Sequence, residues 1–173
     1  MALKDYEKDM ARCSRCSLCK FIPLEQVKDA NYVDVCPSIA RYKFHSYSGG
    51  GKLIVGFALL KERLGYSDGL LDIAYRCQMC GACDTSCKYT RDMEVVEPLY
   101  ELRAKLVKDG QLLPQHIPII EGLRKEDNMM QKPKAERGKW AEGLDVKDII
   151  KEKAEAVYFA GCRYSFDEDL WPI

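Results

Sequence analysis

The sequence lacks the features that direct proteins to nucleic acids, membrane interiors or the secretory pathway. Lysine plus arginine equals aspartate plus glutamate, at 27 residues each, so no net charge draws the chain to a polyanion. Its best apolar run, 53–60, falls far short of the roughly 20 residues that span a bilayer. Residues 1–10 are charged and contain no apolar core, unlike a signal peptide. We therefore expect a cytoplasmic protein.

Histidine and strand-like patterning are also scarce. The chain has two histidines, His45 and His116, which we interpret as surface or packing residues. The alternation of apolar and polar residues that marks a half-buried strand does not occur before residue 150. The glycine loop 48–52 fails the phosphate-binding pattern G-x-x-x-x-G-K-[ST], because positions 46 and 53 are Ser and Leu. These absences disfavour nucleotide binding and favour a mainly helical fold.

Cysteine, by contrast, is abundant, and eight of the nine cysteines fall into two runs. Each run has three cysteines that are spaced by two residues and followed by a more distant fourth. The first run is Cys13, Cys16 and Cys19 with Cys36, and the second is Cys77, Cys80 and Cys83 with Cys87. This spacing is the ligand pattern of a [4Fe–4S] cluster.

The fourth cysteine of each run is expected to serve the other run. A short turn can direct residues i, i+3 and i+6 to three corners of a cube, and it cannot easily reach the fourth. In two-cluster ferredoxins the fourth cysteine therefore ligates the other cluster. We predict two [4Fe–4S] clusters, one in a "Cys87 site" and one in a "Cys36 site". The Cys87 site consists of Cys13, Cys16, Cys19 and Cys87, and the Cys36 site of Cys77, Cys80, Cys83 and Cys36.

Two other uses of the cysteines remain open. A disulfide framework is typical of smaller, secreted domains. A four-cysteine zinc site takes its ligands in C-x-x-C pairs, which leaves the third cysteine of each run surplus. The corresponding alternative function is a zinc-stabilised interaction module.

Helical periodicity dominates the first part of the chain. Apolar residues at helical spacing predict helices over 52–64, 68–75 and 93–108. Ser48 is a candidate N-cap for the first of these, and Ser67 or Asp68 for the second. The fold class is accordingly mainly α, with helices packed around two clusters in a domain over residues 1–112.

The rest of the chain is less regular. Residues 113–156 are interpreted as an extended helical or linker arm that ends in a short helix over 145–153. Residues 157–160 predict a lone β-strand, the first strand of an incomplete domain over 157–173. Because a single strand is unstable alone, we expect neighbouring polypeptide to order this tail.

The two cysteine runs and the loop 48–52 carry a family resemblance. Residues 1–110 resemble the helical ferredoxin domain of heterodisulfide reductase iron–sulfur subunits. The iron–sulfur subunits of anaerobic glycerol-3-phosphate dehydrogenase and of glycolate and lactate oxidases share that domain, and class II benzoyl-CoA reductase complexes contain such subunits. The segment from Tyr158 to Cys162 resembles the start of the cysteine-rich (CCG) domain that follows in fused members. The paired cysteines of that domain are absent here.

Two departures from the compact motif stand inside the runs. Sixteen residues separate Cys19 from Cys36, where the compact motif has three, and Lys88 rather than proline follows Cys87. The resemblance implies an electron-transfer subunit, not catalytic by itself, that links a donor subunit and a catalytic acceptor of a cytoplasmic redox complex in anaerobic metabolism. The alternative is the N-terminal part of a heterodisulfide reductase-like catalytic subunit acting on thiol–disulfide or acyl-CoA substrates. We assign no catalytic residue and expect Cys162 to bind neither cluster.

Charge near the ligands ranks the two sites. Cations flank the ligands of the Cys87 site, whereas Arg76 near the Cys36 site is offset by Asp34 and Asp84. The flanking cations are Arg12, Arg15, Lys20 and Lys88. Since reduction adds negative charge, the sequence predicts that the Cys87 site holds the more easily reduced cluster.

Overall fold

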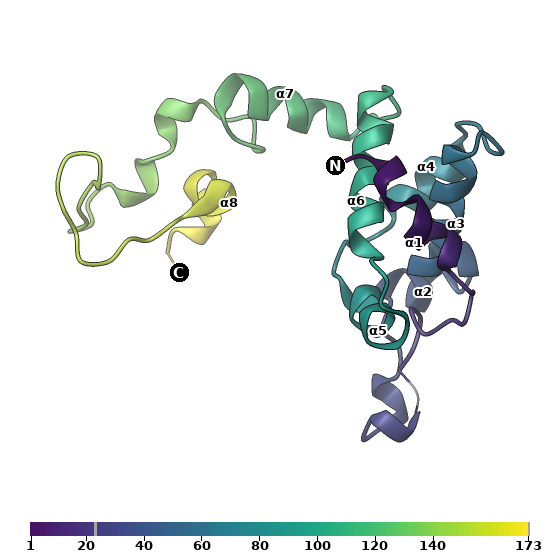
Figure 1. Ribbon diagram of the computed structural model, residues 1–173. Coiled ribbons are helices and arrows are strands. Elements are labelled where there is room, and N and C mark those ends of the chain that lie inside the picture. Colours follow the sequence, from purple (N-terminus) through teal and green to yellow (C-terminus); the bar gives the residue numbers. More distant parts are fainter. Residues whose placement is uncertain (23, 173) are drawn as a thin grey trace. The chain divides into compact units, whose positions relative to one another are not determined.

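The computed structural model describes residues 1–22 and 24–172, and the chain divides into two compact units (Figure 1). Unit 1 is Met1–Leu112 and unit 2 is Leu113–Ile173. Among the described residues, β-pairing is limited to one isolated antiparallel bridge between Phe21 and Asp34. The mainly α fold class predicted from the sequence is confirmed.

Unit 1 is a succession of α-helices and short 3-10 turns. Its α-helices are α1 (Glu7–Arg12), α2 (Pro37–Tyr42), α3 (Gly49–Leu60), α4 (Asp68–Tyr75), α5 (Ala82–Arg91) and α6 (Val96–Lys108). Its 3-10 turns are η1 (Leu3–Tyr6), η2 (Leu24–Gln26), η3 (Ala30–Tyr32) and η4 (His45–Tyr47). Figure 1 shows α5 at one end of α6, to which a short link joins it.

Local signals start three of these helices. The Ser48 hydroxyl accepts a hydrogen bond of 3.0 Å from the Gly51 amide and caps α3. The Ser67 hydroxyl accepts one of 3.3 Å from the Leu70 amide and caps α4. Pro37 occupies the first turn of α2, where a missing amide hydrogen costs nothing. The predicted caps at Ser48 and Ser67 are confirmed, and all three starts depend on residues close in sequence.

The apolar core of unit 1 lies where α1, α3, α4 and α6 meet. Leu53, Leu70 and Leu102 are almost fully buried there. A Cβ atom at Gly56 would lie 3.3 Å from Met10 Sδ and 3.7 Å from Leu102 Cδ2, so the glycine lets three helices approach closely. The buried thiols form part of the same apolar cluster, and they are Cys19, Cys83 and Cys87. The core therefore continues directly into the cysteine-bearing loops.

Unit 2 is organised by a buried amide and an aromatic group. Its elements are α7 (His116–Glu126), η5 (Lys134–Glu136), η6 (Lys139–Ala141), α8 (Gly161–Phe166) and η7 (Glu168–Leu170). Asn128 is fully buried and donates to the carbonyls of Glu126 and Lys132, at 2.8 and 2.7 Å. Trp140 packs edge-on against Tyr158 and Tyr164, with ring centroids 5.7 and 5.5 Å apart.

Unit 2 does not form two of the predicted elements. Residues 145–153 form no helix, and only 149–151 of them make a turn. Residues 157–160 have no regular structure, so the lone strand predicted for the 157–173 domain is absent from the described chain. A strand needs a neighbour for its backbone hydrogen bonds, and here none lies alongside. Tyr158 joins the aromatic group instead, and α8 begins at Gly161, whose φ is 66°.

Candidate metal centre

The four cysteines of the Cys36 site line one cavity. Cys36 is the N-cap residue of α2, and Cys83 lies in the first turn of α5. Cys77 and Cys80 come from the loop between α4 and α5. Other lining residues that bear on the site are Pro37, Gly49, Lys52 and Gly81. Helix α2 therefore delivers the fourth thiol of the first run to the three thiols of the second.

The two runs share one backbone conformation. In the first run the residues on both sides of Cys16 have left-handed φ angles, 59° at Arg15 and 73° at Ser17. The residues on both sides of Cys80 repeat this, with 54° at Met79 and 78° at Gly81. Such angles are uncommon for residues other than glycine, and they cluster at functional sites.

Thiol burial repeats along with the backbone. In each run the first cysteine is half-buried, the middle one is exposed and the third is buried. All nine cysteines of the chain are free. The two turns thus present their thiols in the same way.

Cys87 is grouped with the first run. Burial raises the pKa of Cys87 to about 11, and the neighbouring thiols that raise it further are Cys19, Cys16 and Cys13. Cys13 is the C-cap residue of α1, whereas Cys87 lies within α5. The fourth thiol of the second run therefore belongs to the electrostatic surroundings of the first.

Cys83 lies one helical turn before Cys87 on α5, but most of the thiols that act on it belong to the other site. Burial raises the pKa of Cys83 to about 12, and the next contributions come from Cys77, Cys19 and Cys36. Cys77 and Cys36 belong to the Cys36 site, and Cys19 belongs to the Cys87 site. Helix α5 therefore places one thiol near each group, and Cys19 of the first group also acts electrostatically on Cys83.

The first turn of α3 separates the two groups of thiols. A Cβ atom at Gly49 would lie 2.9 Å from Cys83 Sγ, and one at Gly50 would lie 3.2 Å from Cys13 Sγ. The Gly50 amide also donates to Cys19 Sγ at 3.3 Å. Consecutive glycines thus form a backbone wall between the sites, each facing one of them. The sequence indicated backbone freedom and the Ser48 cap, but it gave no sign of this close approach.

The long excursion in the first run is closed at its base. The Lys20 carbonyl accepts hydrogen bonds from the amides of Val35 and Cys36, at 2.8 and 3.4 Å. The Ile22 amide donates to the Val33 carbonyl at 2.8 Å. The backbone of Cys36 therefore lies beside that of Lys20, the residue that follows Cys19. The 16 residues between Cys19 and Cys36 thus form an excursion whose two ends lie side by side.

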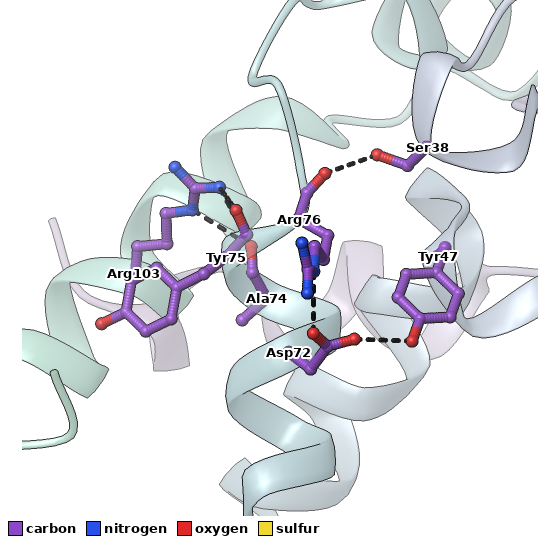
Figure 2. A network of polar contacts seen from close by, with 7 residues as sticks. All are labelled: Ser38, Tyr47, Asp72, Ala74, Tyr75, Arg76 and Arg103. Atoms are coloured by element: carbon purple, nitrogen blue, oxygen red, sulfur yellow. Dashed lines mark hydrogen bonds and ion pairs between the residues drawn. The ribbon is translucent and has the colours of Figure 1, made fainter. Parts of the chain in front are cut away.

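A polar network fixes the chain that leads into Cys77 (Figure 2). The Ser38 hydroxyl, two residues after Cys36, donates to the Arg76 carbonyl at 2.7 Å. Arg103 of α6 donates to the carbonyls of Ala74, Tyr75 and Cys77, the last at 2.5 Å. Backbone carbonyls at the end of α4 are thereby tied to α2 and α6. The network holds the Cys36 and Cys77 segments together.

The same network includes a carboxylate at its edge. Asp72 accepts hydrogen bonds from the Tyr47 hydroxyl at 2.6 Å and from the Arg76 guanidinium at 2.8 Å (Figure 2). These hydrogen bonds, the one from Tyr47 first, lower the pKa of Asp72. The charge of Arg76 is therefore offset by Asp72, whereas Asp84, which the sequence placed opposite Arg76, pairs with Lys88.

Lys88, the residue after Cys87, pairs with carboxylates. Lys88 makes ion pairs with Asp84 and Glu94, both at 3.0 Å. Asp84 also accepts from the amides of Val95 and Val96, at 2.6 and 3.1 Å, and so holds the start of α6. The charge of Lys88 is thus compensated locally. It no longer supports the charge ranking that favoured the Cys87 site.

The remaining candidates take no part in either group of thiols. His45 has a buried Nε2 atom without a hydrogen-bond partner in the described chain, and burial, then Lys20 and Arg15, lower the pKa of His45. Cys162 lies in unit 2, 3.9 Å from the guanidinium of Arg137. The Met129 amide, and Arg137 after it, lower the pKa of Cys162.

The donor set fits a cube. Each site brings four thiols together, and a [4Fe–4S] cube binds one thiolate at each iron, so its ligands surround a volume. Within 1–22 and 24–172, no three histidine, cysteine or acidic side chains are grouped around a position for one ion. The buried thiols of Cys83 and Cys87 stay protonated at neutral pH when alone, and a bound metal deprotonates such ligands.

Comparison with known proteins agrees with this chemistry. Residues 9–90 match the family described as a 4Fe-4S dicluster domain. The match includes both runs with their fourth cysteines and leaves out Cys162. It supports [4Fe–4S] binding and iron–sulfur electron transfer, so the chain is an iron–sulfur protein. No curated protein and no solved structure matches the chain significantly. No described helix has the length and apolar character to cross a membrane.

Replacing Arg103 tests the polar network. We expect Arg103→Met to lower the free energy of unfolding by about 2–3 kcal/mol, because it leaves the carbonyls of Ala74, Tyr75 and Cys77 without their donor. Arg63→Met, at an exposed position, is the matched control. Denaturant unfolding of both variants measures the effect. Equal stability of the two would show that Arg103 does not hold this segment.

Alkylation of the anaerobically purified protein tests which thiols are ligands. We expect iodoacetamide to modify Cys162 alone, and the other eight cysteines to react after a chelator removes the iron. Since the pKa of Cys162 is lowered, its reactive thiolate persists to lower pH than that of an ordinary thiol. Arg137→Met should move the midpoint of its rate–pH profile upward. Protection of Cys162 in the intact protein would make it a metal ligand.

Proposed function

We propose that unit 1 binds two [4Fe–4S] clusters and relays single electrons between a donor subunit and a catalytic subunit of a cytoplasmic redox complex. The observation that supports the proposal is that each fourth cysteine lies near the thiols of the other run. Cys36 lines the cavity of the second run, and Cys87 has the thiols of the first run as its neighbours. Crossed ligation would give each cluster four thiols.

The chain's own residues would hold the clusters and set the route between them. When bound, a [4Fe–4S] cluster accepts and releases one electron at a time. The exposed thiols Cys16 and Cys80 lie at the outer edges of the sites, where a partner protein can approach. The buried thiol of Cys19 acts electrostatically on that of Cys83, and both lie at the inner edges. An electron that enters at one exposed edge would cross between these two and leave at the other.

Unit 2 favours a second candidate function. The lowered pKa of Cys162, with Arg137 beside it, gives this chain a thiolate outside the two sites. Such a group would suit the N-terminal part of a heterodisulfide reductase-like subunit that acts on thiol–disulfide or acyl-CoA substrates. This chain contains no second cysteine near Cys162 in sequence, so catalysis would require groups from other polypeptide.

Metal analysis tests the proposal. Protein purified without oxygen is expected to be brown and to contain about eight irons and eight sulfides per chain, two cubes' worth. Total iron, acid-labile sulfide and zinc are measured on the same sample. Stoichiometric zinc without sulfide would sink the electron-transfer proposal and support the zinc-stabilised module.

Paired cysteine variants test the exchange of ligands. Cys36→Ala should lose one cluster's iron, and adding Cys77→Ala should lose no more, because both residues serve the Cys36 site. Adding Cys13→Ala to Cys36→Ala should remove both clusters. Iron counts on the two double variants give the answer. The opposite pattern, with Cys13 and Cys36 acting on one cluster, contradicts crossed ligation.

A further inference from the structure

A lysine is buried against the Cys36 site. Lys52, in the first turn of α3, is 1% exposed and lines the same cavity as Cys36, Cys77 and Cys83. Its ammonium donates to the Tyr47 carbonyl. Across the described residues, no carboxylate forms an ion pair with it. In the sequence, Lys52 ends the glycine loop 48–52, which does not fit the phosphate-binding pattern. Nothing in the sequence indicated that Lys52 is buried.

The burial of this ammonium calls for a negative partner. Moving a charged group out of water costs several kcal/mol unless an opposite charge faces it. Burial lowers the pKa of Lys52, and the groups that raise it again are Cys77, Cys36 and Cys83. The counter-charge available to Lys52 is therefore the ligand set of the Cys36 site. These thiols supply that charge when they are ionised by a bound metal.

Among the described residues, no cation of the Cys87 site is buried as deeply as Lys52, and Lys20, next to Cys19, is half-buried. Lys88 is paired with Asp84 and Glu94. Arg12 and Arg15 are exposed, and Arg12 donates to backbone carbonyls. Water and salt screen exposed charges, whereas a buried charge acts through a medium of low dielectric constant. The two sites therefore differ in their electrostatic surroundings. The surroundings of the Cys36 site stabilise added negative charge more than those of the Cys87 site do.

We infer that the buried ammonium of Lys52 raises the reduction potential of a cluster at the Cys36 site above that of a cluster at the Cys87 site. The inference rests on the proposed function. One-electron reduction adds one negative charge at the Cys36 site, and a positive side chain buried in the same cavity favours that charge. Electrons would pass from the Cys87 site to the Cys36 site. This order reverses the ranking drawn from charges along the sequence.

Redox titration of the anaerobically purified full chain tests the role of Lys52. The variant Lys52→Met removes the charge and keeps the length of the side chain. We expect the higher of the two midpoint potentials, followed by EPR, to fall by about 59 mV, a tenfold change in the one-electron equilibrium. The lower potential should stay in place. Lys52→Arg, which keeps the charge, should restore most of the shift.

Lys61→Met is the matched control, because Lys61 lies at the other end of α3, is partly exposed and pairs with Glu7. It should leave both potentials unchanged. If Lys52→Met binds full iron and also leaves both potentials unchanged, the inference is overturned and the proposed function stands. Absence of iron from the unaltered chain would instead overturn the proposed function.

A second measurement decides even if variants at Lys52 fail to bind iron. Cys36→Ala removes a ligand of the Cys36 site and leaves Lys52 in place. The inference expects this variant to lose the EPR signal with the higher potential. Loss of the signal with the lower potential would overturn it.

Discussion

The constraint on which the structure depends is that a short cysteine turn can reach three corners of a cube and not the fourth. Two turns of the same conformation occur here, each with left-handed residues on both sides of its middle cysteine. In the proposed ligation, each turn obtains its fourth thiol from the segment that follows the other. The two sites must therefore lie close together, and the chain that passes between them has little room for side chains. Gly49 and Gly50 meet this requirement, because their backbone approaches Cys83 and Cys13 so closely that a Cβ atom would crowd the sulfur atoms.

The supporting interactions follow from the same constraint. Cys36 must leave the first run and reach the second, so the excursion is pinned at the Lys20 carbonyl and Ser38 is tied to the Arg76 carbonyl. The buried thiols are costly to ionise without a metal, since burial raises the pKa of Cys83 to about 12. Cluster binding would therefore release protons and contribute to the stability of unit 1, as metal binding does in other small metal-dependent domains.

Features encoded by neighbouring residues were predictable from the sequence. Ser67 at its cap and Pro37 in the first turn of a helix act through local geometry, and cysteine spacing indicates cube chemistry directly. Features that depend on distant partners were not. The apolar segment 157–160 has strand-like composition, but a strand forms only beside another strand. The close approach at Gly50 and the burial of Lys52 arise from the packing of α3 against loops far away in the sequence.

The central claim is that the two runs exchange their fourth ligands around the start of α3. A crystal structure of the anaerobically purified protein, with anomalous data at the iron edge, tests it most directly. We predict two four-iron clusters, with Cys36 bound to the same cluster as Cys77 and Cys87 bound to the same cluster as Cys13. A single cluster, or Cys36 and Cys13 on the same cluster, would contradict the account.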